Sequence, residues 1–325
     1  MLLQTERWFR DRTWQCPTWG VDELIRAKEG RTVSIVMPAL NEEATVASVV
    51  RTVLPFTRAA PGCTQPLVDE LVVVDSGSTD RTVAVAAEAG ARVVRREDVL
   101  PGVDPVPGKG EVLWRSLSAT RGDLIVFLDS DLIDPDPAFV PGLLGPLLLT
   151  SGVHLVKGFY RRPLRSDATS TEAASGGGRV TELMARPLLA ALRPELAGVV
   201  QPLGGEYAAT RQFLESVPFA AGYGVEIGLL IDAHARYGLY GLAQVNLGVR
   251  EHRNQSLVRL GVMARQILGT ALARCGVCEP ATSTLFTQFV QVEGEWLPDA
   301  SEVLLLDRPP MRDMLLSDVD IAPVS

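Results

Sequence analysis

The stretch Asp123–Asp131 reads DLIVFLDSD and joins a short apolar run to two carboxylates. Such a run, rich in β-branched and aromatic residues, is typical of a buried strand in a parallel sheet. Two similar runs precede it: TVSIVM at 32–37 leads into PALNEE at 38–43, and ELVVVD at 70–75 leads into DSGSTD at 75–80. Because ligands of open α/β sheets bind beyond the carboxyl ends of the strands, we expect these polar segments to meet in one site.

Helical patterns alternate with the strand patterns along the chain. This alternation predicts right-handed crossovers and an α/β fold, with a Rossmann-like, mainly parallel sheet, helices on both faces and a C-terminal helical extension. The predicted helices are 42–53, 80–89, 110–120, 137–149, 179–192 and 257–272, and the further strands are 91–95 and 154–160. The segments 202–209, 225–237 and 242–248 are expected to extend the α/β body.

The composition is that of a globular protein, with 46% hydrophobic and 22% charged residues among 325. A chain with a net charge of −8 is unsuited to bind the negatively charged backbone of a nucleic acid. Residues 1–30 lack the apolar core of a signal peptide, and no apolar run reaches the ~20 residues that cross a bilayer. We therefore expect a cytoplasmic protein that binds neither nucleic acid nor membranes.

Asp129 and Asp131 end the deciding strand with one residue between them. One carboxylate can reach a ribose hydroxyl while the other holds a divalent cation, since Mg²⁺ and Mn²⁺ favour one or two carboxylates together with substrate phosphates and water. An isolated pair of this kind can also be a solvated turn. His252, within REHRN at 250–254, is a possible second metal ligand, although a lone histidine is more often an ordinary surface or core residue.

The segment GGGRVT at 176–181 precedes a predicted helix. Glycines let backbone N–H groups approach an anion, the start of a helix favours negative charge, and Arg179 can hold a carboxylate or phosphate. The same glycines would also suit a flexible hinge. The chain contains no GxxxxGK[ST] phosphate loop, and Lys109, between Gly108 and Gly110, has the pattern of an exposed ammonium that reaches a diphosphate or base.

Taken together, PALNEE, DSGSTD, PGKGE (107–111) and DSD resemble the motifs of GT-A nucleotide-sugar glycosyltransferases. KGFYRRP (157–163), GGGRVTEL (176–183), GEYAA (205–209), GYGVEIGLLID (222–232) and QVNLGVREHRN (244–254) are similar to those of the glucosyl-3-phosphoglycerate synthases, retaining enzymes of glycosyltransferase family 81. The resemblance implies a hexosyltransferase that moves glucose from UDP-glucose to the 2-hydroxyl of 3-phosphoglycerate, in methylglucose lipopolysaccharide biosynthesis. It also implies a magnesium or manganese ion and a homodimer.

The resemblance assigns roles to residues by motif. It implies that Asp131 and His252 bind the metal and that Gly178, Arg179, Val180, Thr181 and Asn254 bind the acceptor. The residues implied for the donor are Pro38, Ala39, Leu40, Asn41, Glu42, Ser76, Lys109, Asp129, Ser130, Tyr223, Gly224, Val225, Glu226, Arg250 and Arg253. It further implies an N-terminal arm at 1–30, a nucleotide-sugar-binding half at 31–160, an acceptor-binding half at 161–278 and a tail at 279–325.

Glu226, Asp131 and Arg250 are the expected catalytic residues. Arg250 and the metal held by Asp131 would stabilise the charge that grows on the departing diphosphate. Retention of configuration requires front-face attack or a double displacement. We favour the front-face route, with Glu226 orienting the glucose hydroxyls, while a covalent route through Glu226 stays open.

Three other functions are compatible with parts of this pattern. Mannosyl-3-phosphoglycerate synthesis from GDP-mannose would use the same scaffold. A sugar-1-phosphate nucleotidyltransferase would carry a Gly-rich basic loop where this chain has PALNEE. A catalytically inactive binding module is the third, and the intact Asp129, Asp131, His252 and Arg179 argue against it.

Overall fold

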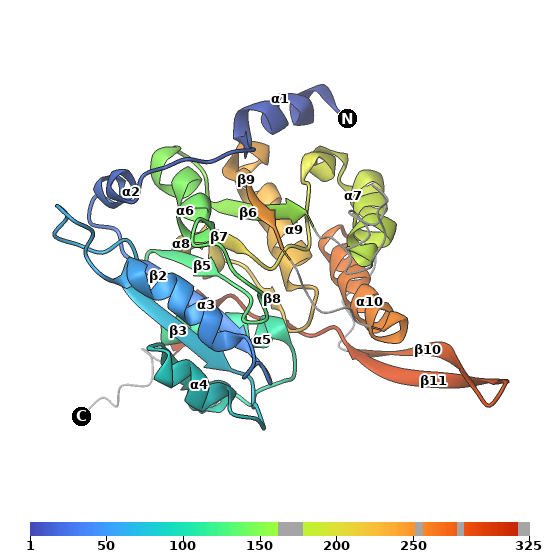
Figure 1. Ribbon diagram of the computed structural model, residues 1–325. Helices are drawn as coiled ribbons and strands as arrows, with labels where there is room; N and C mark the ends of the chain where they lie inside the picture. Colours follow the sequence, from blue (N-terminus) through green and yellow to red (C-terminus); the bar gives the residue numbers. More distant parts are fainter. Residues whose placement is uncertain (162–177, 251–255, 278–282, 318–325) are drawn as a thin grey trace, which may run out of the picture.

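A mixed sheet of eight strands forms the centre of the molecule (Figure 1). The computed structural model describes residues 1–161, 178–250, 256–277 and 283–317. In spatial order the strands are β1 (Thr13–Trp14), β9 (Leu242–Val249), β6 (Leu155–Arg161), β7 (Tyr207–Thr210), β5 (Leu124–Phe127), β2 (Val33–Ala39), β3 (Glu70–Asp75) and β4 (Arg92–Arg95). All neighbours pair in parallel except β7, which runs antiparallel to both β5 and β6. The predicted mainly parallel sheet is therefore confirmed.

Two apolar cores lie on opposite faces of this sheet. Successive strand residues point to opposite faces, so Ile35 and Met37 join one core while Val36 joins the other. One face is covered by α2 (Val21–Ala27), α3 (Val46–Val53), α4 (Thr82–Glu88) and α6 (Phe139–Leu149). The other is covered by α1 (Leu3–Arg12), α5 (Lys109–Ala119), α7 (Arg186–Leu192), α8 (Arg211–Leu214), α9 (Val225–Tyr237) and α10 (Leu257–Arg274). Helices thus cover both faces, as the sequence predicts.

The N-terminal arm is part of the folded body. The ring nitrogen of Trp8, which is fully buried, donates to the carbonyl of Leu242 at 2.8 Å. Beyond α1, strand β1 extends the sheet edge by pairing Thr13 with Gln244. The aromatic residues of the arm therefore pack against the sheet.

The C-terminal extension is only partly helical. Helix α10 is followed by a long antiparallel hairpin of β10 (Ser283–Val292) and β11 (Glu295–Leu304), which projects from the body (Figure 1). The sequence pattern at 283–304 does not predict this hairpin. The chain then returns to the body, where β12 (Asp307–Arg308) pairs with β8 (Phe219–Ala220) and α11 (Met311–Ser317) follows. None of the helices among the described residues combines the length and the apolar character that a membrane span requires.

Candidate active site

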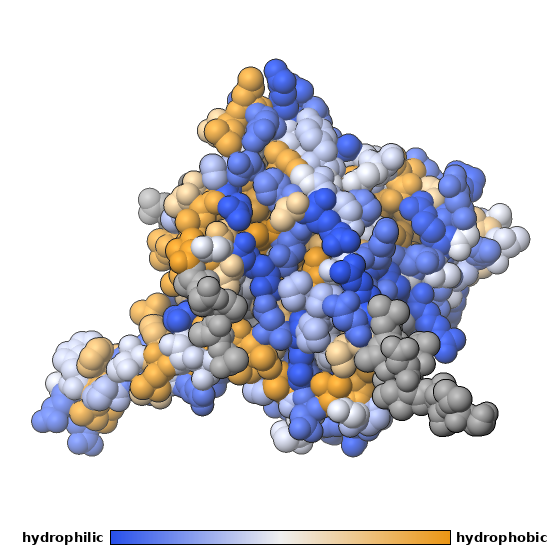
Figure 2. Space-filling model, turned by 180° about the vertical axis from the view of Figure 1, so that it is seen from behind, coloured by the Kyte–Doolittle hydropathy of each residue, from blue (hydrophilic) through white to orange (hydrophobic). Residues whose placement is uncertain are grey.

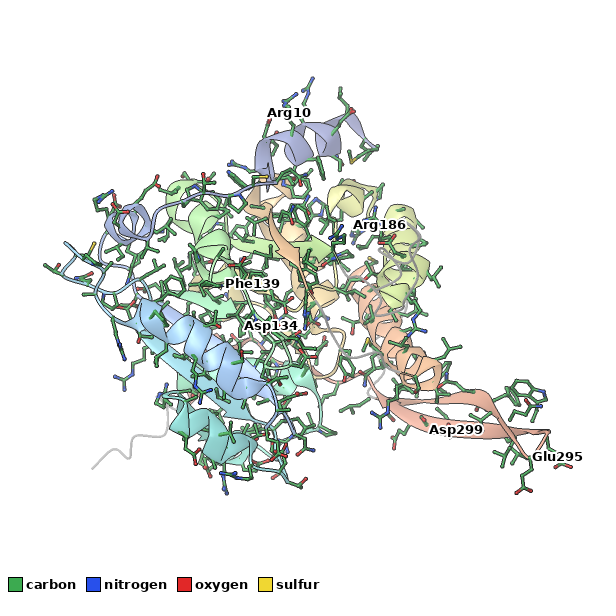
Figure 3. The ribbon with its side chains drawn as sticks, viewed as in Figure 1. Arg10, Asp134, Phe139, Arg186, Glu295 and Asp299 are labelled. Atoms are coloured by element: carbon green, nitrogen blue, oxygen red, sulfur yellow. The ribbon has the colours of Figure 1, made fainter. Side chains whose placement is uncertain are left out.

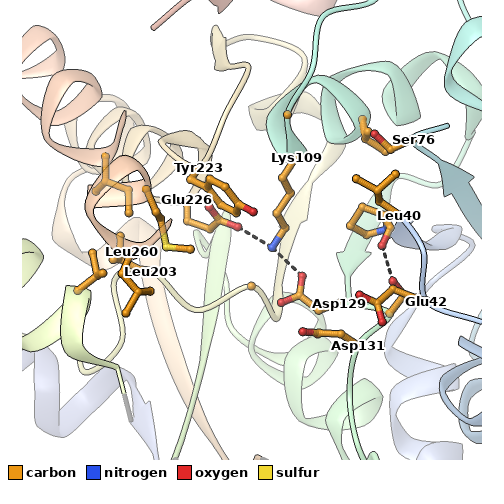
Figure 4. A pocket seen from close by; sticks show the side chains of 18 of the residues that line it. Leu40, Glu42, Ser76, Lys109, Asp129, Asp131, Leu203, Tyr223, Glu226 and Leu260 are labelled. Atoms are coloured by element: carbon orange, nitrogen blue, oxygen red, sulfur yellow. Dashed lines mark hydrogen bonds and ion pairs between the residues drawn. The ribbon is translucent and has the colours of Figure 1, made fainter. Parts of the chain in front are cut away.

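A cavity of about 440 Å³ lies beyond the carboxyl ends of β2, β3 and β5 (Figure 4). The polar segments that follow these three strands all contribute to its wall, as the sequence predicts. The remaining wall comes from α5, α9, α10, the turn before Thr181 and the segments that carry Leu203, Gly205, Tyr223 and Arg250. The lining includes Pro38, Ala39, Leu40, Glu42, Ser76, Lys109, Asp129, Ser130, Asp131, Gly178, Arg179, Val180, Thr181, Leu203, Gly205, Tyr223, Glu226, Arg250, Leu260, Met263 and Ile267.

Lys109 is the centre of a tight ion-pair group on the cavity floor (Figure 4). Its Nζ lies 2.6 Å from Asp129 Oδ1 and 2.8 Å from Glu226 Oε1. Burial disfavours the ammonium, but the charges of Asp129 and Glu226 outweigh burial and raise the Lys109 pKa well above its usual value. The expected exposed ammonium is thus a largely buried cation shared by two carboxylates.

Arg250 forms ion pairs with both carboxylates of the DSD motif, Asp129 and Asp131. Its Nη2 lies 3.0 Å from Asp129 Oδ2 and 2.9 Å from Asp131 Oδ1. Burial alone would raise the pKa of Asp129, but the nearby cations Lys109 and Arg250 hold that pKa well below its usual range. Asp129 therefore carries a negative charge with both oxygens paired, whereas Asp131 is more exposed and faces the cavity.

A second layer of charged groups lies beneath the floor. Glu206 is fully buried and pairs with Nη1 of Arg250 at 2.9 Å. Lys157 Nζ donates to the carbonyl of Gly204 at 2.6 Å and lies 4.5 Å from the centre of the Tyr207 ring. Burial lowers the pKa of Lys157 to about 8. These groups give the cavity a rigid, charged base.

Gly205 lets the two layers approach closely. A Cβ added at this position would lie 2.3 Å from Asp129 Oδ2 and 2.7 Å from Lys109 Nζ. Any larger residue would therefore displace the carboxylate or the ammonium. Only glycine fits beside this ion pair.

Side-chain hydrogen bonds join the end of β2 to the loop after β5, and the loop after β2 to the loop after β3. Ser130 Oγ donates to the carbonyl of Pro38 at 2.7 Å. Asn41 adopts a positive φ of 56° and its side-chain oxygen accepts from the backbone N–H of Thr79 at 2.9 Å. Asn41 thus connects the loops after β2 and β3 and lies outside the cavity wall.

The turn at Gly178–Thr181 forms another part of the wall. Gly178 has a positive φ of 85°, and its carbonyl accepts from the N–H of Glu182 at 3.0 Å. A π-helical turn, Thr181–Ala185, begins here and continues into α7, where the sequence predicts an α-helix over 179–192. The turn directs Arg179 and Thr181 toward the same cavity as Asp131.

Comparison with known proteins is consistent with this architecture. The Glycosyl transferase family 2 model matches residues 34–149. Glucosyl-3-phosphoglycerate synthase of Mycolicibacterium smegmatis is 61% identical over 308 residues, covering 95% of this chain and 98% of the relative. The chain belongs to the glucosyl-3-phosphoglycerate synthase family. It is therefore a glycosyltransferase, and its central sheet is that of the GT-A fold.

Two solved structures of the Mycobacterium tuberculosis synthase are similar to this family member along most of their length. The complex with Mn²⁺, UDP-glucose and phosphoglyceric acid has a TM-score of 0.82 and 56% identity, covering 93% of this chain and 98% of the other. The complex with Mg²⁺ and UDP has a TM-score of 0.82 and 55% identity, covering 93% and 99%.

Most of the predicted synthase residues that the structure describes lie in the cavity wall. Asn41, Gly224 and Val225 do not; Val225 is fully buried in the core, and a Cβ on Gly224 would meet Thr270. His252, Arg253 and Asn254 lie outside the described residues.

Sequence reasoning missed Leu203, Gly205, Glu206, Lys157 and the face of α10. GEYAA gave no signal that singles out Gly205 or Glu206, because Glu70 and Asp123 also directly precede apolar strand residues.

Proposed function

We propose that the chain transfers glucose from UDP-glucose to the 2-hydroxyl of 3-phosphoglycerate with retention of configuration. The observation that carries this proposal is the presence of Asp131 and Arg179 in the wall of one cavity. Such a transfer needs a site for the metal and the diphosphate of the donor, near Asp131. It also needs a site for the anionic acceptor, at the turn that carries Arg179. Since nucleotide sugars are cytoplasmic metabolites, we also propose that the chain acts in the cytoplasm.

The donor site is proposed on the side of the cavity formed by the loops after β2 and β3. Backbone and side-chain groups of Pro38, Leu40 and Ser76 would contact the uridine, because they form one continuous wall near Asp129. Asp129 has both oxygens paired with cations, so its main role would be to hold Lys109 and Arg250 in place. Tyr223, two residues before the start of α9, would face the sugar.

A divalent metal fits the residues around Asp131. This carboxylate lines the cavity, and its Oδ1 is paired with Arg250, whereas Oδ2 has no ion-pair partner among the described residues and could bind a ligand in the cavity. One carboxylate, substrate phosphates and water suit Mg²⁺ or Mn²⁺. Asp131 and, by motif, His252 would hold the ion. A bound ion would neutralise charge on the diphosphate oxygens.

Arg250 and Glu226 would bind two other parts of the donor, the diphosphate and the glucose. The guanidinium of Arg250 would stabilise the diphosphate as the bond to the anomeric carbon breaks. Glu226 is buried and paired with Lys109, a setting that suits fixed hydrogen bonds to glucose hydroxyls better than covalent attack. In the front-face route the acceptor oxygen forms the new bond to the anomeric carbon, and its proton passes to the leaving diphosphate.

We further propose that the chain forms a homodimer through the β10–β11 hairpin. The pairing of Phe289 with Pro298 places Leu285, Phe289 and Trp296 on one face, and these side chains are 71%, 63% and 67% exposed. Figure 2 shows apolar residues on this projection, and Figure 3 shows Glu295 at its far end. Exposed apolar faces of this kind support association. In light scattering, a F289E/W296E variant should be monomeric, and the tip variant E295Q should remain dimeric.

A turnover assay tests the proposed reaction. UDP release should require both UDP-glucose and 3-phosphoglycerate, and replacing the acceptor by glycerate should abolish release because the anion-binding turn loses its phosphate. Faster reaction with GDP-mannose would instead support the mannosyl alternative. The absence of turnover with either donor would refute the assignment.

A further inference from the structure

Glu206 reaches the active site because of the direction of β7. This residue directly precedes β7, whose first residue Tyr207 pairs with Phe127 and with Lys157. Since β7 runs antiparallel to its neighbours, its beginning lies at the carboxyl end of β5, where Asp129 emerges. The strand thereby places a fully buried carboxylate directly beneath the cavity floor.

The two ends of the Arg250 guanidinium have different surroundings. Nη1 lies 2.9 Å from Glu206 Oε1 and donates to the hydroxyl of Tyr160 at 2.7 Å, and both partners are buried. Nη2 lies between Asp129 and Asp131 at the cavity floor. One end is therefore anchored in the protein interior, and the other faces the place where substrate binds.

We propose that Glu206 is a positioning residue that fixes Arg250 through Nη1, so that Nη2 can exchange Asp131 for diphosphate oxygens without the guanidinium moving away. This inference rests on the proposed function of the cavity. A fully buried carboxylate is costly without a partner, so Arg250 cannot leave Glu206 when substrate arrives. The planar guanidinium then carries the orientation set at Nη1 to Nη2.

Tyr160 completes the anchor. Its hydroxyl accepts from Arg250 and also hydrogen-bonds Glu206. The Tyr160 ring lies 5.4 Å from the guanidinium carbon of Arg250. Removing this hydroxyl in Y160F should weaken the anchor and leave the buried ion pair intact, so this variant tests the same idea with less risk to folding.

A double-mutant cycle between Glu206 and Arg250 tests the proposal. E206Q should lower kcat about 10- to 100-fold in the wild-type background, the range typical for residues that orient a functional group. In the R250A background E206Q should change kcat less than about 3-fold, because the group that Glu206 positions is absent. The KM for 3-phosphoglycerate should stay unchanged in E206Q and in Y160F.

The control is D69N, which also removes the charge of an acidic partner from a buried cation. Asp69 pairs with Lys28 at 2.7 Å just before β3, at the opposite end of the strands from the cavity. D69N should lower the melting temperature with kcat and both KM values unchanged. An equal effect of E206Q in both backgrounds, or wild-type kinetics in E206Q and Y160F, would overturn the proposal.

Calorimetric titration with UDP and Mg²⁺ separates this inference from the proposed reaction. The affinity for UDP should be lower in E206Q than in the wild type. In the double variant R250A/E206Q it should be no lower than in R250A. This readout needs no turnover, so it remains decisive if the wild-type protein fails to use UDP-glucose. Equal losses of UDP affinity in the two backgrounds would also contradict the role of Glu206.

Discussion

Lys109 Nζ lies 2.8 Å from Glu226 Oε1, and this ion pair joins the first turns of α5 and α9 across the cavity floor. The same ammonium holds Asp129 at the end of β5. The first turn of α5, the end of β5 and the first turn of α9 are thus connected through one cation. Because this site is largely buried, loss of the shared cation would leave the charge of Glu226 without a partner in a poorly solvated place.

Replacing Lys109 by methionine should therefore destabilise the protein by about 2–4 kcal/mol, since the buried Glu226 loses its partner. Adding E226Q should recover part of this loss, with a coupling free energy of at least about 1 kcal/mol between the two positions. Urea unfolding of the wild type, K109M, E226Q and the double variant measures the coupling. Additive free energies would show that the pair contributes nothing specific.

Gly205 should not tolerate even a methyl group. In G205A the new Cβ would meet Asp129 Oδ2 and Lys109 Nζ, so one of these charged groups must move. We expect kcat/KM to fall about 100-fold, because small displacements of positioning groups have large effects on rate. The matched control is G102A, where an added Cβ has nothing within 4 Å. Comparable kinetics in the two variants would argue against the close approach.

The sequence predicts the parts of this molecule whose signals are local. The strands at 33–39, 70–75 and 124–127 are nearly saturated with buried apolar residues, and their polar ends point to one site in any parallel sheet. Helix α1 and the β10–β11 hairpin, in contrast, are not predicted from the sequence. In strand 283–292 apolar side chains occupy both faces, with Leu285 and Phe289 on one and Phe286 and Val290 on the other, so the alternation of a strand with one buried face is absent.

The second layer of the site depends on topology. Glu206 becomes a neighbour of Arg250 only because β7 is antiparallel, and four residues, Tyr207–Thr210, are too few to reveal strand direction. The motif around Asn41 predicts a donor contact, yet its positive φ and its bond to Thr79 make it a loop connector. Asn tolerates this conformation better than most residues, which gives a physical reason for its presence there.

Asp131 should control the response to metal. In D131N the oxygen that faces the cavity loses its charge, so the Mn²⁺ concentration for half-maximal rate should rise at least about 10-fold and kcat should fall about 100-fold. Titration of Mn²⁺ against initial rate and against UDP affinity measures both effects. D134N is the control, since Asp134 is an exposed residue of the same segment outside the cavity wall. An unchanged metal requirement in D131N would remove Asp131 from the metal site.

Lys157 should make the stability of the protein depend on pH above neutrality. Burial lowers the pKa of its ammonium to about 8, the nearby charge of Glu226 opposes this shift, and the ordinary value of 10.5 returns on unfolding. Between these two values the unfolded chain binds a proton that the folded chain has released, so the free energy of unfolding rises with pH across this window. Below pH 8 the folded protein carries the full cost of the buried charge.

The K157M variant isolates this contribution, because it removes the titrating amine and keeps a side chain of similar length. Between pH 7 and 9.5 the free energy of unfolding of the wild type should rise by about 1–2 kcal/mol relative to K157M. Urea unfolding at several pH values measures the difference, and the other ionisable groups cancel in the subtraction. Parallel curves for the two proteins would mean that Lys157 titrates at an ordinary pKa in the fold, and that the layer beneath Glu226 is better hydrated than its burial indicates.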